Sequence, residues 1–114
     1  MSFELLSESK NNVLILSMSG RLDSINSTHA EADLLDQIEN STTAVVLDLE
    51  MLDYVASAGL RIVLMAAKRA KAQNKPFLLC ALQPQIHHVF EISGFLKILS
   101  VYSSQTEAIA ALNH

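Results

Sequence analysis

The sequence predicts an α/β fold, a single domain in which a mixed, mostly parallel β-sheet packs against about four α-helices. Three observations lead to this fold class. Short apolar runs alternate with segments of helical periodicity along the chain. The first two apolar runs lie close enough to form an antiparallel hairpin, whereas helical segments separate the later ones, which favours right-handed parallel crossovers. Half of the 114 residues are hydrophobic and no repeat or linker interrupts them, so residues 1–114 are expected to form one domain.

The N-terminal segment predicts a hairpin followed by a polar loop. Residues 3–8 form a weak strand and residues 13–18, VLILSM, a stronger one, with two asparagines between them. Gly20 is predicted to end the second strand. The loop that follows carries the polar residues Arg21, Asp23, Ser24 and Asn26.

A helix and a buried strand come next. Thr28 and Glu31 have the spacing of a capping box, which predicts a helix from there to about Ile38. The near-continuous apolar run Val45–Leu49 is typical of a central strand that is buried on both faces. Asp48 interrupts this run near its carboxyl end. Its carboxylate is expected either to hydrogen-bond the following turn or to form part of a functional rim.

The most informative stretch leads from that strand, through a short turn, into the next helix. Helical spacing begins at Ser57 and continues to about Gln73. A serine in this position is a good N-cap, because its hydroxyl can accept a hydrogen bond from a free amide of the first turn. The position also suits a phosphate, since those amides and the helix dipole favour negative charge. Ser57 is therefore open to three interpretations, namely a helix cap, a nucleophile or a phosphorylation switch.

The C-terminal third predicts two further strands and two further helices. Pro84 suits the first turn of a helix, where its missing N–H is not needed, and Gly94 suits the end of that helix. Ser104 and Glu107 form a second capping box. The predicted elements are, in order, a strand at 77–82, a helix at 84–94, a short edge strand within 96–101 and a helix that begins at 104.

The composition argues against several classes of function. The net charge of −4 disfavours a nucleic-acid partner, which usually requires a clustered basic face. No run of about 18 apolar residues is present, as a membrane-spanning helix would need. The start, MSFELLSESKNN, lacks the basic and apolar regions of a signal peptide. We therefore expect a cytoplasmic protein that contacts neither nucleic acid nor membrane.

No metal or cofactor site is predicted. The single cysteine, Cys80, has no cysteine partner and lies in an apolar run, so we expect a buried, unreactive thiol. The histidines show no metal-ligand spacing with acidic residues or with Cys80. They are His29, His87, His88 and His114.

The segment around Ser57 also resembles the G-x-S-x-G elbow of serine hydrolases. Val55 replaces its first glycine, although the tight turn of that elbow requires a small residue. The available bases, His87 and His88, lie inside a predicted helix rather than in a loop. These features argue against a hydrolase, and we expect a protein without enzymatic activity. Asp23 is a second candidate residue, which either caps its own loop through an Asx turn or belongs to a functional site.

Taken together, the segments resemble the STAS domain family, and within it the stand-alone anti-sigma factor antagonists of bacteria. The resemblance covers nearly the whole chain. It is carried by the order and spacing of Gly20–Asp23 (GRLD), Val45–Leu49, Tyr54–Arg61 (YVASAGLR) and Val89–Phe95 (VFEISGF). The fold that it implies has the element order derived above.

The resemblance implies a partner switch. An unphosphorylated antagonist of this kind binds an anti-sigma factor that is also an ATP-dependent serine kinase, and so releases the sigma factor. The kinase phosphorylates the serine that matches Ser57, which ends the interaction, and a PPM-type phosphatase restores it. The match to Asp23 implies a role in kinase recognition and phosphotransfer.

Two positions depart from the family pattern. Many antagonists have Asp or Ser immediately before the phosphorylated serine, where this chain has Ala56, and a second Ser or Thr immediately after it, where this chain has Ala58. The second change removes any ambiguity about the acceptor. The first leaves open a protein that binds its partner without being phosphorylated.

The expected interface combines the loop at 20–26, the turn at 53–57 and the exposed side of the helix that follows. Besides Ser57, its residues are Arg21, Asp23, Asn26, Tyr54, Ala56, Ala58, Gly59, Leu60 and Arg61. Two alternatives remain, a STAS subunit of a signalling or secretion complex that involves no sigma factor, and a module that binds a nucleotide or another small ligand. A monomer is expected.

Overall fold

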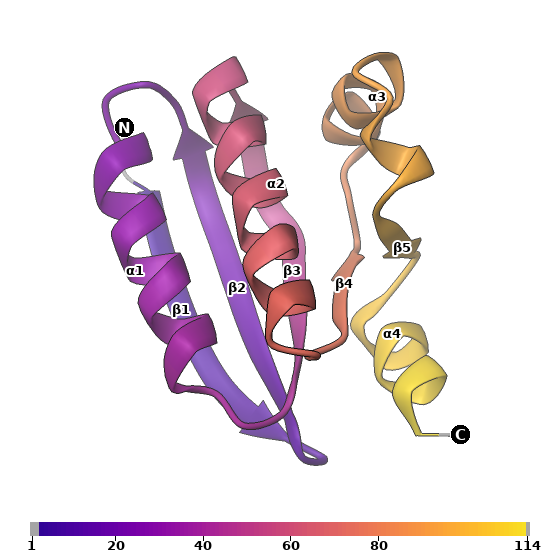
Figure 1. Ribbon diagram of the computed structural model, residues 1–114. Coiled ribbons are helices and arrows are strands. Elements are labelled where there is room, and N and C mark those ends of the chain that lie inside the picture. The colour runs from indigo at the N-terminus through magenta and orange to yellow at the C-terminus, as the bar shows by residue number, and fades with distance from the viewer. Residues whose placement is uncertain (1–2, 114) are drawn as a thin grey trace.

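The computed structural model describes residues 3–113 and has the predicted α/β architecture (Figure 1). Its five-stranded sheet has the order β1-β2-β3-β4-β5, in which β1 is antiparallel to β2 and all other pairs are parallel. The elements are β1 (Phe3–Lys10), β2 (Val13–Leu22), α1 (Ser27–Asn40), β3 (Ala44–Val55), α2 (Ser57–Ala72), β4 (Phe77–Cys80), α3 (Pro84–Ile92), the 3-10 helix η1 (Phe95–Lys97), β5 (Ser100–Tyr102) and α4 (Gln105–Leu112). The predicted fold class and element order are confirmed.

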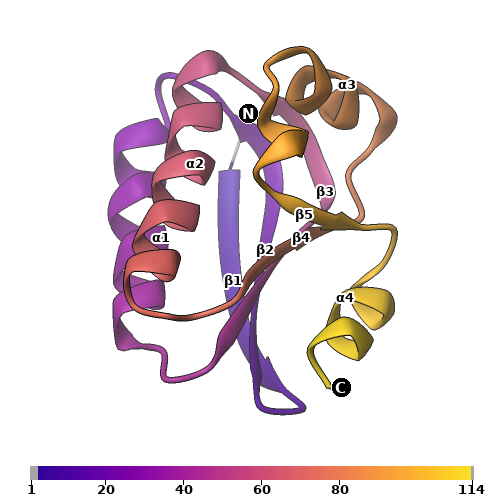
Figure 2. The ribbon, with the colours of Figure 1, turned by 45° about the vertical axis from the view of Figure 1, so that its right-hand side comes forward.

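The sheet separates two apolar layers, because α1 and α2 lie on one side of it and α4 on the other (Figure 2). The larger layer, between the sheet and α1, α2 and α3, contains Leu47, Leu34, Ile62 and Phe90 among its fully buried residues. The smaller layer lies against α4 and consists of Val13, Ile15, Val46, Leu78, Cys80, Ala108 and Ile109. Successive strand residues point to opposite faces, so the apolar run 45–49 serves both layers, as its sequence predicted.

The hairpin forms as predicted, but its second strand is longer. Asn11 and Asn12 form the two-residue turn with positive φ values of 54° and 61°, as a type I′ turn requires. The prediction that Gly20 ends β2 is wrong, because the strand continues to Leu22. A register shift against β3 falls between Gly20 and Arg21, and the positive φ of Gly20, 89°, accommodates the distortion without ending the pairing.

Strand β3 also extends beyond its apolar run. The turn expected before Ser57 is absent, since β3 continues to Val55 and only Ala56 separates it from α2. The residues after Asp48 pair with β2 but not with β4, whose pairing with β3 ends at Cys80. Polar and exposed residues such as Glu50 and Asp53 alternate there with the buried Leu49, Leu52 and Val55, and this mixed pattern made the segment resemble a turn.

Two predicted helix caps are wrong. Helix α1 follows Asn26 and has no side-chain cap, so Thr28 and Glu31 form no capping box. The N-cap of α2 is Ala56 in an extended conformation, and Ser57 is the first helical residue, so Ser57 does not cap the helix. Before α1, the amide of Asn26 donates a hydrogen bond to Asp23 of the loop, and before α2, the amide of Ala56 donates one to the carbonyl of Leu22 in β2. The local sequence reveals neither contact.

The C-terminal elements mostly follow the prediction. Pro84 begins α3, Gly94 follows it with a φ of 80°, and the hydroxyl of Ser104 accepts a 3.1 Å hydrogen bond from the amide of Glu107 at the start of α4. Strand β4 ends two residues earlier than expected, because Ala81 adopts a positive φ of 61°. The predicted edge strand within 96–101 is replaced at its start by η1 and runs from Ser100 to Tyr102.

Candidate functional site

The carboxyl ends of β2 and β3 lie at the same edge of the sheet, at the top of Figure 1. There the amide of Ala56 donates a 2.9 Å hydrogen bond to the carbonyl oxygen of Leu22. Asp23 directly follows Leu22, and Ser57 directly follows Ala56. The structure therefore brings together the two segments that sequence reasoning singled out.

Ser57 is exposed and begins helix α2. Its side chain makes no hydrogen bond with any residue in the described range 3–113. The first intrahelical bond of α2 joins the amide of Leu60 to the carbonyl of Ala56, so the amides of the three residues before Leu60 have no partner within the helix. The hydroxyl is accessible to another protein and lies at the positive end of the helix dipole.

Gly59 permits α2 to approach the sheet closely. It is buried, and a Cβ atom at this position would lie 2.8 Å from Cγ of Leu22 and 2.9 Å from Cγ2 of Val55. Such distances are too short for carbon atoms, so a larger residue would push the helix start away from the strand ends. Gly59 was predicted as a partner contact, but its burial makes it a packing residue that positions Ser57 indirectly.

The loop after β2 is held by its own side chains. Oδ1 of Asp23 accepts hydrogen bonds from the amides of Ile25, at 3.1 Å, and Asn26, at 3.0 Å. Nδ2 of Asn26 donates to the carbonyl of Arg21 at 2.9 Å, and Oγ of Ser27 donates to the carbonyl of Ser24 at 3.1 Å. The Asx interpretation of Asp23 is thus correct, yet within the described residues Oδ2 has no hydrogen bond, which leaves one carboxylate oxygen for another molecule.

At the tip of this loop, Ile25 is 88% exposed. Sequence reasoning missed this residue, although an isoleucine within a polar loop was a visible signal. A large apolar side chain that a well-bonded loop holds in water contributes little to the fold. Ile25 is therefore a candidate contact residue of the site.

Arg21 and Tyr54 are cross-strand neighbours at the same edge of the sheet. The guanidinium carbon of Arg21 lies 4.1 Å from the centroid of the Tyr54 ring, in a cation–π contact. On α2, Arg61 is exposed and stands four residues after Ser57, so both lie on one face of the helix. Nη1 of Arg61 lies 3.4 Å from Sδ of Met65 and forms no ion pair among the described residues.

The remaining predicted residues lie elsewhere. His87 and His88 are exposed on α3 and form no hydrogen bond with Ser57, so the described structure contains no hydrolase arrangement around that hydroxyl. No group of three potential metal ligands occurs within residues 3–113, and His114 lies outside the described residues. No helix in the same range is long and apolar enough to cross a membrane.

Cys80 and Asp48 are both accounted for by packing. Burial, with a smaller effect of the charges of Asp48 and Glu50, raises the pKa of the Cys80 thiol to about 12. Asp48 accepts from the amide of Glu50 at 3.0 Å and from Nε2 of Gln105 at 2.8 Å. The carboxylate thus binds its own strand and α4, and not a following turn as expected.

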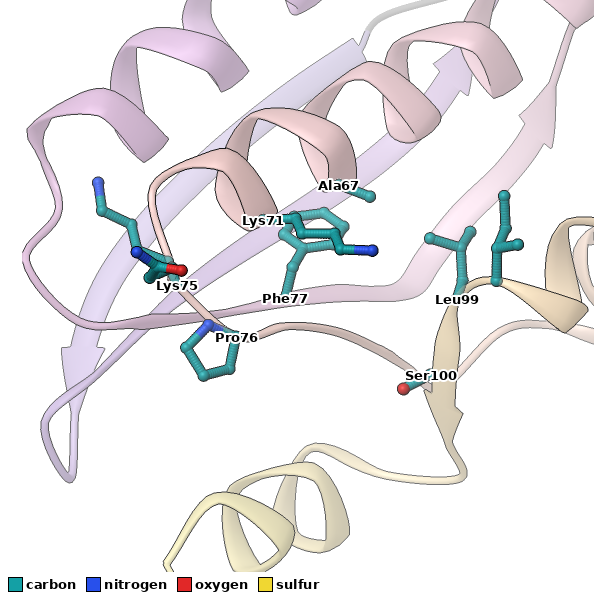
Figure 3. A pocket seen from close by; sticks show the side chains of 9 residues that line it. Ala67, Lys71, Lys75, Pro76, Phe77, Leu99 and Ser100 are labelled. Carbon is teal, nitrogen blue, oxygen red and sulfur yellow. The ribbon is translucent and has the colours of Figure 1, made fainter.

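One surface cleft, of about 370 Å³, lies at the other end of the sheet (Figure 3). Its side chains come from the end of α2, the loop before β4 and the start of β5. Nζ of Lys75 is bound to the carbonyl of Ile38 at 2.6 Å and to Oε1 of Gln73 at 2.7 Å. The cleft is separate from Ser57 and Asp23 and does not belong to the candidate site.

Comparison with known proteins identifies the family. The profile described as STAS domain matches residues 4–108. BtrV of Bordetella bronchiseptica is 44% identical to this chain over 99 residues, which are 87% of this chain and 85% of BtrV.

Two solved structures show the same fold. A crystal structure of an anti-sigma factor antagonist from Mycobacterium paratuberculosis aligns with a TM-score of 0.91 at 23% identity, over 99% of this chain and 96% of that one. The Bacillus cell fate determinant SpoIIAA, in its phosphorylated form, aligns with a TM-score of 0.72 at 22% identity, over 97% of this chain and 99% of that one. With the family match and the relationship to BtrV, these results show that the chain belongs to the STAS domain family.

Proposed function

We propose that this protein is an anti-sigma factor antagonist that acts by partner switching through Ser57. In its unphosphorylated form it binds an anti-sigma factor that is also an ATP-dependent serine kinase. Phosphorylation of Ser57 ends the complex, and a PPM-type phosphatase restores it in the cytoplasm. BtrV is named as a candidate anti-sigma factor antagonist, and the solved mycobacterial relative is described as an antagonist.

The observation that carries the proposal is the position of Ser57. Its hydroxyl is exposed at the start of α2, free of internal hydrogen bonds within the described residues, and close in the fold to the Asp23 loop through the bond between Ala56 and Leu22. The existence of a phosphorylated form of SpoIIAA, which shares this fold, agrees with a phosphoryl acceptor in the family.

The chemistry of the step follows from the position. Oγ of Ser57 attacks the γ-phosphorus of ATP held by the kinase, a new O–P bond forms as the bond to ADP breaks, and the hydroxyl proton passes to a base of the kinase. The free Oδ2 of Asp23 is available to bind a kinase donor that orients this reaction. The product is a phosphoserine with about −1.5 to −2 charges at neutral pH.

The fold tolerates that charge where a partner does not. A phosphate on the first residue of α2 interacts favourably with the helix dipole and is within reach of Arg61, one turn further on. At an interface the same group adds bulk and negative charge against an acidic kinase site. We therefore expect phosphorylation to act on binding and not on folding.

The contact surface of this proposal comprises Ser57, Ala58, Leu60 and Arg61 of α2, Tyr54 and Ala56 before it, Arg21 at the end of β2, and Asp23, Ile25 and Asn26 of the β2–α1 loop. Leu60 is only partly exposed and also packs against the core. Ile25, Tyr54 and Arg61 are exposed and offer the largest accessible side chains for a partner, beside the exposed hydroxyl of Ser57.

The test is mass spectrometry of the protein isolated from its own cells, with and without the phosphatase gene. A single phosphate on Ser57 that accumulates without the phosphatase is expected. An unmodified Ser57 in every condition would instead indicate a module that binds constitutively, for which Ala56 before the acceptor would be the explanation.

Two further measurements separate the alternatives. Addition of the purified protein to the kinase–sigma complex should release the sigma factor, and failure to do so with intact binding would indicate an output other than a sigma factor. A thermal shift caused by GTP or ATP in the absence of the kinase would indicate the ligand-binding alternative.

A further inference from the structure

Part of one face of the sheet has no helix over it among residues 3–113. Helices α1, α2 and α3 cover one face, while on the other face α4 packs on β3, β4 and β5 and reaches Val13 and Ile15 at the start of β2 (Figure 2). Toward the carboxyl ends of β2 and β3, and along β1, no described element lies over this face. The uncovered part is thus a strip across three neighbouring strands.

Two large apolar side chains lie in this strip. Cross-strand pairing places Leu6 beside Ser17, and Met51 beside Ser19. Leu6 is 58% exposed and Met51 is 65% exposed, and both line one hollow of about 290 Å³. A second hollow shares Leu6 and Ser17 and extends along β1. We call the surface formed by Leu6, Glu8, Ser17, Ser19, Asp48, Glu50 and Met51 the β1–β3 trough.

The charged side chains that line the trough are all carboxylates. They are Glu8, Asp48 and Glu50, and no described lysine or arginine lines either hollow. Lys10, two residues after Glu8 on β1, donates a 3.3 Å hydrogen bond to Oε1 of Gln105 and lies outside both hollows. Asp48 is bound through both oxygens to Glu50 and Gln105, whereas Glu8 and Glu50 are exposed. The negative rim disfavours anionic lipid or nucleic acid, and it disfavours a second copy, whose trough would bring the same carboxylates into opposition.

Helix α4 shows how this face of the sheet accepts a helix. Its small and branched side chains Ala108 and Ile109 lie in the layer with Val46, and Gln105 at its start hydrogen-bonds Asp48 at the border of the trough. A second helix beside it would extend the same layer over Leu6 and Met51. Positive charges on this second helix would complement the carboxylates of Glu8 and Glu50.

We infer that the β1–β3 trough is a docking site for a cationic amphipathic helix of another protein. Aliphatic side chains of that helix contact Leu6 and Met51, and its lysines or arginines pair with Glu8 and Glu50. The trough lies on the face of the sheet opposite α2, so this site is distinct from Ser57 and does not depend on the function proposed for it.

The probe for a binding assay is a fluorescein-labelled synthetic peptide of leucine and lysine with all leucines on one face of a helix. A scrambled peptide and a peptide with glutamate in place of lysine are the comparisons. Fluorescence anisotropy with the full chain should show binding of the leucine–lysine peptide and of neither comparison peptide.

Two variants test the location of the site. Met51→Lys and Glu50→Lys should each raise the Kd of the leucine–lysine peptide by about tenfold or more. Ile98→Lys is the matched control, because Ile98 is also 65% exposed but lies after η1, outside the trough, and it should leave the Kd unchanged.

Changes in backbone amide chemical shifts when the peptide is added to the unmodified protein locate the binding site without any variant. The inference requires such changes at Leu6, Ser17, Ser19 and Met51. Shifts on the acidic side of α1, equal binding of the scrambled peptide, or no binding at millimolar peptide would overturn it. Self-association that Met51→Lys abolishes would also overturn it and assign the trough to a second copy. Ser57→Asp should not change the peptide Kd, which separates this result from the fate of the partner switch.

Discussion

The amide of Ala56 donates a 2.9 Å hydrogen bond to the carbonyl oxygen of Leu22, and the residues that follow this pair, Ser57 and Asp23, are the two candidate functional side chains. One main-chain bond therefore sets the spacing of the site. Gly59 reinforces it, because its missing side chain lets α2 contact the ends of both strands. The site consists of the exposed hydroxyl of Ser57 and the carboxylate of Asp23, of which only Oδ1 accepts hydrogen bonds within the described residues.

Ser57→Asp should weaken binding to the kinase while the melting temperature stays the same or rises slightly. A carboxylate on the first residue of α2 interacts favourably with the helix dipole, by about 0.3–1 kcal/mol. Calorimetry and a binding assay with the kinase measure the two effects. Ser9→Asp is the control, since Ser9 is exposed near the hairpin and should affect neither quantity. A large drop in melting temperature for Ser57→Asp would show that the position is structural.

Gly59→Ala should lower the free energy of unfolding by about 1–3 kcal/mol, the usual range for overpacking a tight contact. The added methyl group would lie 2.8 Å from Cγ of Leu22 and 2.9 Å from its carbonyl oxygen. Urea denaturation measures the change, and Ser57→Ala, two residues earlier on the exposed side, should stay within about 0.5 kcal/mol of the parent. Equal stability of the two variants would mean that the helix start can shift at little cost.

Asp23→Asn and Asp23→Ala should separate the two roles of this side chain. Asparagine keeps an oxygen that accepts from the amides of Ile25 and Asn26, so the loop should remain intact while the charge offered to the kinase is lost. Alanine removes both hydrogen bonds and should cost roughly 1 kcal/mol of stability. The rate of Ser57 phosphorylation should fall in both variants, and an unchanged rate in Asp23→Asn would remove Asp23 from the phosphotransfer step.

The Cys80 thiol should resist modification by Ellman's reagent at pH 8 in the folded protein and react at once in urea. Burial raises its pKa from 9.0 to about 12, so the reactive thiolate is absent near neutral pH. Rapid reaction without denaturant would show that the smaller apolar layer opens.

The same pKa shift predicts how stability depends on pH. The unfolded chain loses the thiol proton at a lower pH than the folded protein, so the contribution of Cys80 is complete below pH 9.0 and is lost as the pH rises to about 12. Between pH 9 and 12 the free energy of unfolding, measured by denaturation at each pH, should fall less steeply for Cys80→Ala than for the parent. An equal fall in both proteins would contradict the assignment.

Much of the fold could be predicted because its signals are local. The two asparagines of the hairpin, Pro84 at the start of α3 and the Ser104 cap each act within a few residues, and all three are observed. The candidate site was also visible, since Asp23 and Ser57 stand in motifs with a specific spacing. The cap expected at Thr28 failed because α1 already begins at Ser27, after the loop that Asp23 holds, so Thr28 lies within the first turn and not at the N-cap.

The sequence by itself determined the order of the strands and helices, through apolar periodicity, and it determined which serine and which aspartate stand at strand ends. Only the tertiary structure decided that β2 and β3 continue to Leu22 and Val55, that Ser57 begins its helix without capping it, and that Leu6 and Met51 share an uncovered surface. The physical reason is that strand ends, caps and exposed patches depend on partners far away in the chain. Periodicity shows which face of a strand or helix is apolar. Which element covers that face, and which group binds the end of the strand or helix, is decided by tertiary packing.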